Sequence, residues 1–188
     1  LKATQSGFDF IFSKFSINKS LRTKSSFHNV NIQASNWWII PEIKKRWNKL
    51  ITNDPNITYE EYISTIFFHD SKPLKMLSIG SGICSHETSL AKLNPHWEIL
   101  CVDFSDNLLE KARKNAEARK INNINFLVED IYNSNLPDDY FDIVFFHSSL
   151  HHFKNLKEFI PQKVISKLVK NGILIINEYV GPNRLQFP

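Results

Sequence analysis

The fold of this chain is decided by the stretch Lys75-Met76-Leu77-Ser78-Ile79-Gly80-Ser81-Gly82. Its first five residues predict a short buried strand, and the glycines after them predict a turn that leads into a helix. Gly80 allows the chain to turn sharply as it leaves the strand, and Gly82 allows the backbone to approach a ligand closely. A glycine turn that opens onto a helix N-terminus favours a nucleotide-binding site.

An acidic residue ends the second predicted strand. Residues 98–102 form a mostly apolar run, and Asp103 follows them. The separation from the glycine turn is close to the roughly 20 residues expected when two strand ends face the same crevice. We expect Asp103 to accept hydrogen bonds from both hydroxyls of a ribose, and the adjacent Phe104 to contact the same ligand. The glycine turn alone fits a purely structural role equally well, so the interpretation depends on the motifs after Asp103.

Strands and helices continue to alternate in this later part of the chain. Ser105 is expected to cap a helix with one apolar face, and further strands are predicted at 125–131, 141–146 and 173–176. A helix is predicted from 156 to 169, before the helix-stop signal Asn171-Gly172. Together these elements predict an α/β domain.

At this point the chain resembles the class I methyltransferases that use S-adenosylmethionine. The resemblance covers roughly residues 74–188 and implies a Rossmann-like, mostly parallel sheet with helices on both faces, with S-adenosyl-L-methionine as the cofactor. The resemblance implies a set of cofactor-binding residues at the strand ends. They are Gly80, Ser81 and Gly82 in the glycine turn, Asp103 at the ribose with the adjacent Phe104, Asp130 and Ile131 beside the adenine, and His147 at the tip of the fourth strand. Asn171-Gly172 resembles the family's turn before the fifth strand.

Two positions depart from the family pattern. The acid that usually stands two residues before the first glycine is Ser78 here, and the usual third glycine is Cys84. Both departures fall at the methionine end of the implied cofactor. Glu87, one turn into the helix, is a candidate to replace the missing acid. A solvated carboxylate favoured by the helix dipole is an equally good interpretation of Glu87.

A nicotinamide dinucleotide is the competing cofactor, because Ser85 is a small residue at the position where such sites open their helix. The later motifs favour the methyltransferase. A dehydrogenase needs neither an acid directly after the third strand nor a polar loop His147-Ser148-Ser149-Leu150-His151-His152 after the fourth.

Two residues are candidates for removing a proton from the acceptor. His151 follows the fourth predicted strand, and a histidine accepts protons near neutral pH. Glu178 follows the fifth strand, at the carboxyl edge where open α/β sheets bind ligands. Either residue fits the role of catalytic base, and for His151 a helix-start residue bonded to backbone is an equal alternative. The histidines do not have the spacing of a metal site, so no metal is predicted.

Charge and the loop after the fourth strand bear on the acceptor. The net charge is +4 and the sequence pI is about 9.0, but no run of five basic residues occurs. Family members that methylate nucleobase amines resemble one another in an Asn/Asp-Pro-Pro-aromatic motif, which His147-Ser148-Ser149-Leu150 replaces here. We therefore expect a small-molecule or sugar acceptor, methylated on oxygen or nitrogen, rather than nucleic acid. The alternatives are an RNA methyltransferase and a non-catalytic cofactor-fold domain of a larger protein.

Composition predicts one enzyme domain with an extension. The 188 residues are 42% hydrophobic and 22% charged, which suits a methyltransferase domain at 71–188 and an N-terminal extension at 1–70 with aromatic and basic helices. No apolar run reaches the roughly 20 residues of a membrane span. The two cysteines near buried strands and the lack of a secretory signal favour the cytoplasm. Because the sequence begins with Leu1 and stops just after the fifth strand, we expect the last strands of the fold to be absent.

Overall fold

The computed structural model describes residues 40–68 and 72–178. The chain divides into two compact units, Leu1–Ile63 and Ser64–Pro188. In the first unit, α3 (Pro41–Thr52) begins at a proline, which suits a first helical position. Thr58 and Glu61 form a reciprocal capping box at the start of α4 (Tyr59–Glu61). The π-helix η2 (Tyr62–Phe67) follows directly, and the boundary between the two units falls within it.

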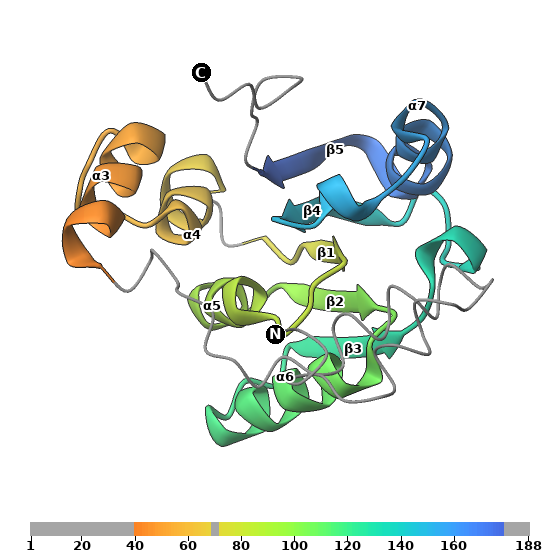
Figure 1. Ribbon diagram of the computed structural model, residues 1–188, viewed down its shortest axis with the longest axis horizontal. Coiled ribbons are helices and arrows are strands. Elements are labelled where there is room, and N and C mark those ends of the chain that lie inside the picture. Colours follow the sequence, from red (N-terminus) through yellow and green to blue (C-terminus); the bar gives the residue numbers. More distant parts are fainter. Residues whose placement is uncertain (1–39, 69–71, 179–188) are drawn as a thin grey trace, which may run out of the picture. The chain divides into compact units, whose positions relative to one another are not determined.

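The second unit is built on a sheet of five parallel strands in the order β3-β2-β1-β4-β5 (Figure 1). The strands are β1 (Lys75–Ile79), β2 (Glu98–Asp103), β3 (Ile124–Val128), β4 (Phe141–His147) and β5 (Leu168–Asn177). The helices are α5 (Ser85–Leu93), α6 (Asp106–Ala118), η3 (Ile131–Asn133), η4 (Leu150–His152), α7 (Leu156–Phe159), η5 (Ile160–Val164) and η6 (Ile165–Lys167). The Rossmann-like fold expected from the sequence is confirmed.

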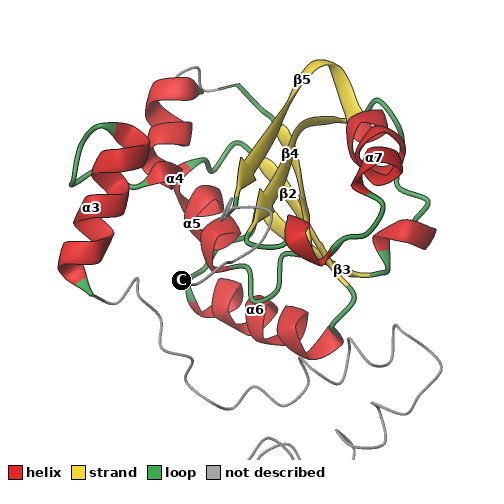
Figure 2. Ribbon diagram, turned by 45° about the horizontal axis from the view of Figure 1, so that its top comes forward, coloured by secondary structure: helices red, strands yellow, loops and turns green. Residues whose placement is uncertain are grey.

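Helices cover both faces of the sheet, as Figure 2 shows for α5 and α7. Phe159 of α7 and Val164 of η5 belong to the same buried cluster as Leu77 and Val144 of the central strands. On the other face, α5 approaches β1 through a hydrogen bond between Glu87 and Ser78. Successive side chains of a strand point to opposite faces of the sheet, so Leu77 and Ser78 of β1 lie on opposite faces.

The region between α7 and β5 differs from the prediction. The helical segment ends at Lys167 rather than at residue 169, because Leu168 already pairs with Phe141 of β4. Asn171, predicted to stop the helix, has a left-handed φ of 67° and lies with Gly172 inside β5, where the register with β4 shifts. The pair therefore forms an irregularity within a strand and not the end of a helix.

Both cysteines of the sequence are buried free thiols, with Cys84 directly before α5 and Cys101 within β2. Within the two described ranges, no helix has the length and apolar character needed to cross a membrane.

Candidate active site

The candidate site lies at the edge where the parallel strands end. β1, β2 and β4 end at Ile79, Asp103 and His147, and Glu178 follows the end of β5. The pairing of Ile79 with Val102 and of His147 with Asn177 keeps these ends level. Since ligands of open parallel sheets bind outside the carboxyl ends of the strands, this edge is where a ligand is expected.

Asp103 connects the end of β2 to the glycine turn. Its carboxylate accepts the N–H of Gly82 at 2.9 Å and the N–H of Ser105 at 2.8 Å, one on each oxygen. Burial raises the pKa of Asp103 above its ordinary value, although these backbone bonds and the nearby His152 act in the opposite direction. A carboxylate has about four lone-pair sites, so Asp103 keeps capacity for a further donor besides its backbone partners. Asp103 is thus a fixed, largely desolvated acceptor beside the turn.

The two glycines are needed for different reasons. Both have left-handed backbone, with φ of 70° at Gly80 and 56° at Gly82. A Cβ at Gly80 would lie 3.0 Å from the Cβ of Ser149, whose hydroxyl donates to the carbonyl of Ile79 at 2.8 Å. A Cβ at Gly82 would meet nothing within 4 Å. Gly80 therefore makes room for the loop after β4, while Gly82 borders open space.

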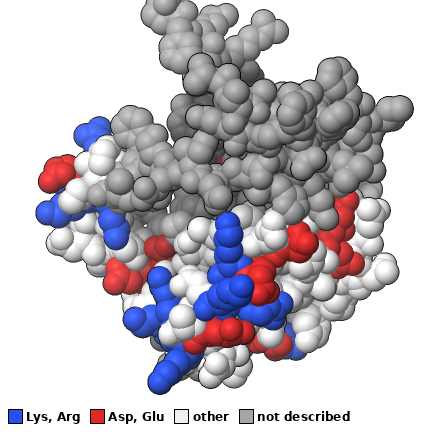
Figure 3. All heavy atoms as spheres, turned by 60° about the horizontal axis from the view of Figure 1, so that its bottom comes forward, with Lys and Arg blue, Asp and Glu red and all other residues white. Residues whose placement is uncertain are grey.

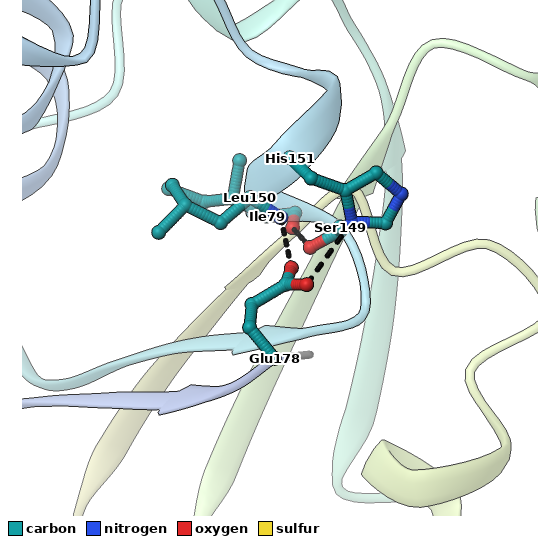
Figure 4. Close-up of polar contacts among 5 residues, drawn as sticks. All are labelled: Ile79, Ser149, Leu150, His151 and Glu178. Carbon is teal, nitrogen blue, oxygen red and sulfur yellow. Dashed lines mark hydrogen bonds and ion pairs between the residues drawn. The ribbon is translucent and has the colours of Figure 1, made fainter. Parts of the chain in front are cut away.

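His151 and Glu178, predicted as rivals, lie in contact (Figure 4). The Nδ1 atom of His151 is 3.0 Å from Oε2 of Glu178, and the other carboxylate oxygen accepts the N–H of Leu150 at 2.5 Å. The side chain of Glu178 is 9% exposed and that of His151 is 55% exposed. A largely buried carboxylate that accepts a backbone N–H thus contacts an imidazole that is more than half exposed.

His152 lies beside His151 in η4. Its ring centroid is 4.0 Å from that of His151. Burial is the main cause that lowers the pKa of His152, and the neighbouring His151 adds to it, while Glu178 and Asp103 act in the opposite direction. His152 and Asp103 thus interact electrostatically. The expected cofactor acid and the two candidate bases therefore share one edge.

A comparison with known families identifies this fold and site. A family model described as "Methyltransferase domain" matches residues 70–186, which is more than half of the 188-residue chain. The chain belongs to this methyltransferase family. The matched range contains the glycine turn, Asp103, His151 and Glu178. The family resemblance expected from the sequence is confirmed, and the alternative of a nicotinamide-dependent dehydrogenase is not supported.

Curated relatives match parts of the chain. It is 30% identical over 106 residues to the release factor glutamine methyltransferase of Francisella tularensis, a match that covers 52% of this chain and 37% of that protein. It is 32% identical over 87 residues to an uncharacterised methyltransferase of Schizosaccharomyces pombe, with 43% and 31% covered. The matches thus span about a third of the length of these relatives.

Solved structures share the methyltransferase fold. An S-adenosylmethionine-dependent methyltransferase from Aquifex aeolicus aligns with a TM-score of 0.57 at 16% identity, over 79% of this chain and 77% of that one. Phosphoethanolamine N-methyltransferase 2 of Haemonchus contortus, solved with S-adenosyl-L-methionine, aligns with a TM-score of 0.56 at 23% identity, over 63% of this chain and 27% of that one. At these identities the likeness concerns the fold.

The two departures from the methyltransferase pattern have structural explanations. Ser78 donates a 2.6 Å hydrogen bond to Glu87, and Glu87 is only 2% exposed. The interpretation of Glu87 as a solvated carboxylate is therefore wrong. Instead, α5 brings a carboxylate to the strand position where the family usually has an acid.

Cys84, in place of the third glycine, has a φ of 53°. This left-handed conformation explains why glycine is usual at the position, and for another residue it costs about 1 to 3 kcal/mol. Cys84 also lies against Cys101, whose pKa is raised by burial and by Cys84 itself. The turn is thus packed onto a pair of buried thiols.

The structure describes the residues assigned to the adenine and the residues at the start of α6. Asp130 is exposed and caps η3 by accepting the N–H of Tyr132 at 3.1 Å. The side chain of Ile131 is buried in the core. Phe104 is half-buried between Asp103 and α6 in the chain. Ser105 is the N-cap of α6, but the cap bond expected from its side chain is not formed. Its backbone N–H is donated to Asp103.

His147 has a partner that sequence reasoning did not find. Its ring stacks on that of His86 with centroids 3.6 Å apart and an angle of 30°. No local pattern links the first turn of α5 with the end of β4, because the contact depends on the sheet order. Within the described part of the chain, no group of three or more metal-ligating side chains occurs.

Proposed function

We propose that this chain transfers a methyl group from S-adenosyl-L-methionine to an oxygen or nitrogen of a small-molecule or sugar acceptor. The observation that carries the proposal is Asp103. It is a buried acceptor, fixed by the N–H groups of Gly82 and Ser105, beside the open space at Gly82. The family shown by the comparison supports the reaction class.

The residues at the edge fit this cofactor. Asp103 has free lone pairs for ribose hydroxyls, and Gly82 leaves the backbone open to a close approach. Asp130 and the backbone of Ile131 are assigned to the adenine, by resemblance to the family. The buried carboxyl of Glu87 accepts a hydrogen bond from Ser78, at the strand position that is acidic in the family. His147 with its partner His86 borders the same edge.

The cofactor supplies an electrophilic methyl group on a sulfonium. The chain's own contribution is positioning, since methyl transfer needs an in-line approach rather than a covalent enzyme intermediate. Asp103 and the glycine turn fix one reactant, and the loop 148–153 with Glu178 borders the place for the other. His151 or Glu178 accepts the proton that an oxygen or nitrogen acceptor loses.

A small acceptor is favoured over RNA. Figure 3 shows acidic side chains interspersed with Lys and Arg on one face, and in α6 Glu110 pairs with Arg113 and Lys114. RNA binding relies on a coherent positive surface. The Francisella relative is named for a glutamine acceptor, but only 37% of its length is matched, so its acceptor is not carried over. The free thiols of Cys84 and Cys101 favour a reducing, cytoplasmic setting.

Calorimetry with S-adenosylhomocysteine tests the proposal. Replacing Asp103 with alanine removes two hydrogen bonds to a charged acceptor, so the affinity is expected to fall by about 2 to 4 kcal/mol. The matched control is Glu110→Ala, which removes an exposed carboxylate from α6 and is expected to bind like the parent. A thermal melt of each variant confirms that it folds. Unchanged binding by Asp103→Ala, or tighter binding of NAD than of S-adenosylhomocysteine by the parent, contradicts the assignment.

Transfer of a tritiated methyl group separates the remaining alternatives. We expect the parent to label the small-molecule fraction of a metabolite extract. Label confined to RNA, with binding that weakens steeply with salt, favours an RNA methyltransferase. Cofactor binding without transfer to either fraction favours a non-catalytic domain.

A further inference from the structure

We propose that Glu178 is a positioning residue, which holds His151 with its proton on Nδ1 and so leaves Nε2 as the atom that takes the acceptor's proton. The inference rests on the proposed methyl transfer and deepens it. His151 is then the base, and Glu178 contributes by orienting the imidazole of His151.

The geometry of Glu178 fixes its orientation. One carboxylate oxygen accepts the N–H of Leu150 and the other faces Nδ1 of His151 at 3.0 Å. Both contacts belong to η4, and Ser149 at its start is itself tied to the carbonyl of Ile79 at 2.8 Å. Figure 4 shows these contacts converging on one short segment. Both oxygens of Glu178 are therefore engaged with η4, which leaves His151 as the group that accepts the proton.

The identity of the partner atom determines the tautomer. A carboxylate oxygen accepts hydrogen bonds and does not donate them, so the ring nitrogen that faces it must carry a proton. In the neutral imidazole, the other nitrogen then has a lone pair. Figure 4 shows this second nitrogen pointing away from Glu178. The ring is 55% exposed, so a reactant can reach it, while the carboxylate is 9% exposed and cannot be reached in the same way.

The proton balance of the step is complete. As the acceptor oxygen or nitrogen forms a bond with the methyl carbon, the carbon–sulfur bond breaks and its electron pair stays on sulfur. The acceptor's proton passes to Nε2 of His151. Glu178 then faces an imidazolium, which a carboxylate at hydrogen-bond distance stabilises.

The other charged groups around the ring are compatible with this role. His152, on the same short helix, lies 4.0 Å away and opposes a second positive charge. The pKa of His152 is lowered, first by burial and then by His151, which disfavours a charge on this second ring. Asp103, at the end of β2, acts on His152 from the other side. Of the two rings, His151 is the one that contacts the carboxylate of Glu178.

Nuclear magnetic resonance of the histidine rings tests the proposal without an acceptor. The full chain, labelled with ¹⁵N and saturated with S-adenosylhomocysteine, is observed above neutral pH, and the His151 signals are assigned by their loss in His151→Gln. We expect the parent ring to be protonated on Nδ1. In Glu178→Gln, the amide oxygen must accept the Leu150 N–H, so the amide NH₂ faces Nδ1 and the ring is expected to switch to the Nε2–H form.

The measurement has clear contrary outcomes. A parent ring protonated on Nε2, or the same tautomer in the parent and in Glu178→Gln, overturns the proposal. Glu110→Gln, which changes an exposed carboxylate of α6, is the matched control and is expected to leave the His151 tautomer unchanged. Should Glu178→Gln not fold, the tautomer of the parent decides alone. Binding of S-adenosylhomocysteine, measured in the same samples, tests the proposed function separately.

Discussion

Two carboxylates at the same edge of the sheet, Asp103 and Glu178, are anchored alike but present different partners. Asp103 accepts two backbone N–H groups, and Glu178 accepts one backbone N–H and one imidazole. Asp103 is the last residue of β2 and Glu178 follows the last residue of β5. In both cases the strand end supplies a carboxylate that fixes the loop of a neighbouring strand.

Asp103 and Glu178 differ in the hydrogen-bonding groups that they leave available to a ligand. The remaining capacity of Asp103 is its own lone pairs, next to a glycine that borders open space. Glu178 has both oxygens in use, and what it exposes is the ring of His151. A carboxylate held by backbone alone thus suits binding, whereas one that also holds an imidazole suits proton transfer.

The largest effect is expected from removing the imidazole. Loss of a general base typically lowers turnover by about 10²- to 10⁴-fold, so His151→Ala should show this with cofactor affinity nearly intact. Glu178→Gln should lose part of the same effect, and the double variant should be no slower than His151→Ala, because the residues act as one unit. Transfer of a tritiated methyl group to the fraction that the parent labels measures all three.

The pH profile sharpens this prediction. The base acts only when unprotonated, so turnover of the parent should fall on acidification, and His151→Ala should lack this acid limb. Added imidazole should restore part of the activity of His151→Ala, since the ring is exposed. If the limb persists in His151→Ala, Glu178 is itself the base and the comparison fails. Near-full activity of both variants would mean that catalysis rests on positioning.

A middle-sized effect is expected from the two glycines. Alanine at either position meets the strain of a left-handed backbone, about 1 to 2 kcal/mol. Gly80→Ala also presses on Ser149, which adds about 1 to 3 kcal/mol. Urea unfolding should therefore show Gly80→Ala to be the less stable variant. Gly82→Ala should instead show the clearer loss of S-adenosylhomocysteine affinity relative to its stability. Equal destabilisation by both would mean that Ser149 yields at no cost.

The smallest effect is expected at Ser78 in β1, the strand that leads into the glycine turn held by Asp103, and it concerns the free energy of unfolding. Ser78→Ala removes the hydroxyl that donates to the buried carboxylate of Glu87, which should cost about 1 to 2 kcal/mol of unfolding free energy. The matched control is Ser89→Ala, whose hydroxyl donates to the carbonyl of Ser85 at an exposed position of α5. The control should change stability by less than about 0.5 kcal/mol. Equal unfolding free energies of Ser78→Ala and Ser89→Ala would show that Glu87 does not depend on Ser78.

Local patterns predicted the strands and the chemistry at their ends, because strand, turn and acid are adjacent in the sequence. Asp103, the glycine turn and the candidate pair His151 and Glu178 all follow from such patterns. Their contacts do not, since the hydrogen bond between His151 and Glu178 joins residues 27 positions apart. The stack of His86 on His147 likewise required the sheet order.

The irregular entry to β5 shows a second limit. Asn171-Gly172 has the composition of a helix stop, and left-handed backbone does occur there. Pairing of Leu168 with Phe141 nevertheless placed the start of the strand before the pair. Tertiary pairing therefore set the boundary, while local propensity set only the backbone conformation.

The two buried thiols beside the glycine turn can report on local opening of the domain. Cys84 and Cys101 are the only cysteines of the sequence, and both are shielded from reagents. A thiol reacts as its thiolate, which the raised pKa of Cys101 makes scarce. Alkylation of the folded domain thus has to wait for the structure to open locally. The alkylation rate therefore measures how often the domain opens locally, without any introduced label. A ligand that stabilises the closed turn is expected to slow this alkylation.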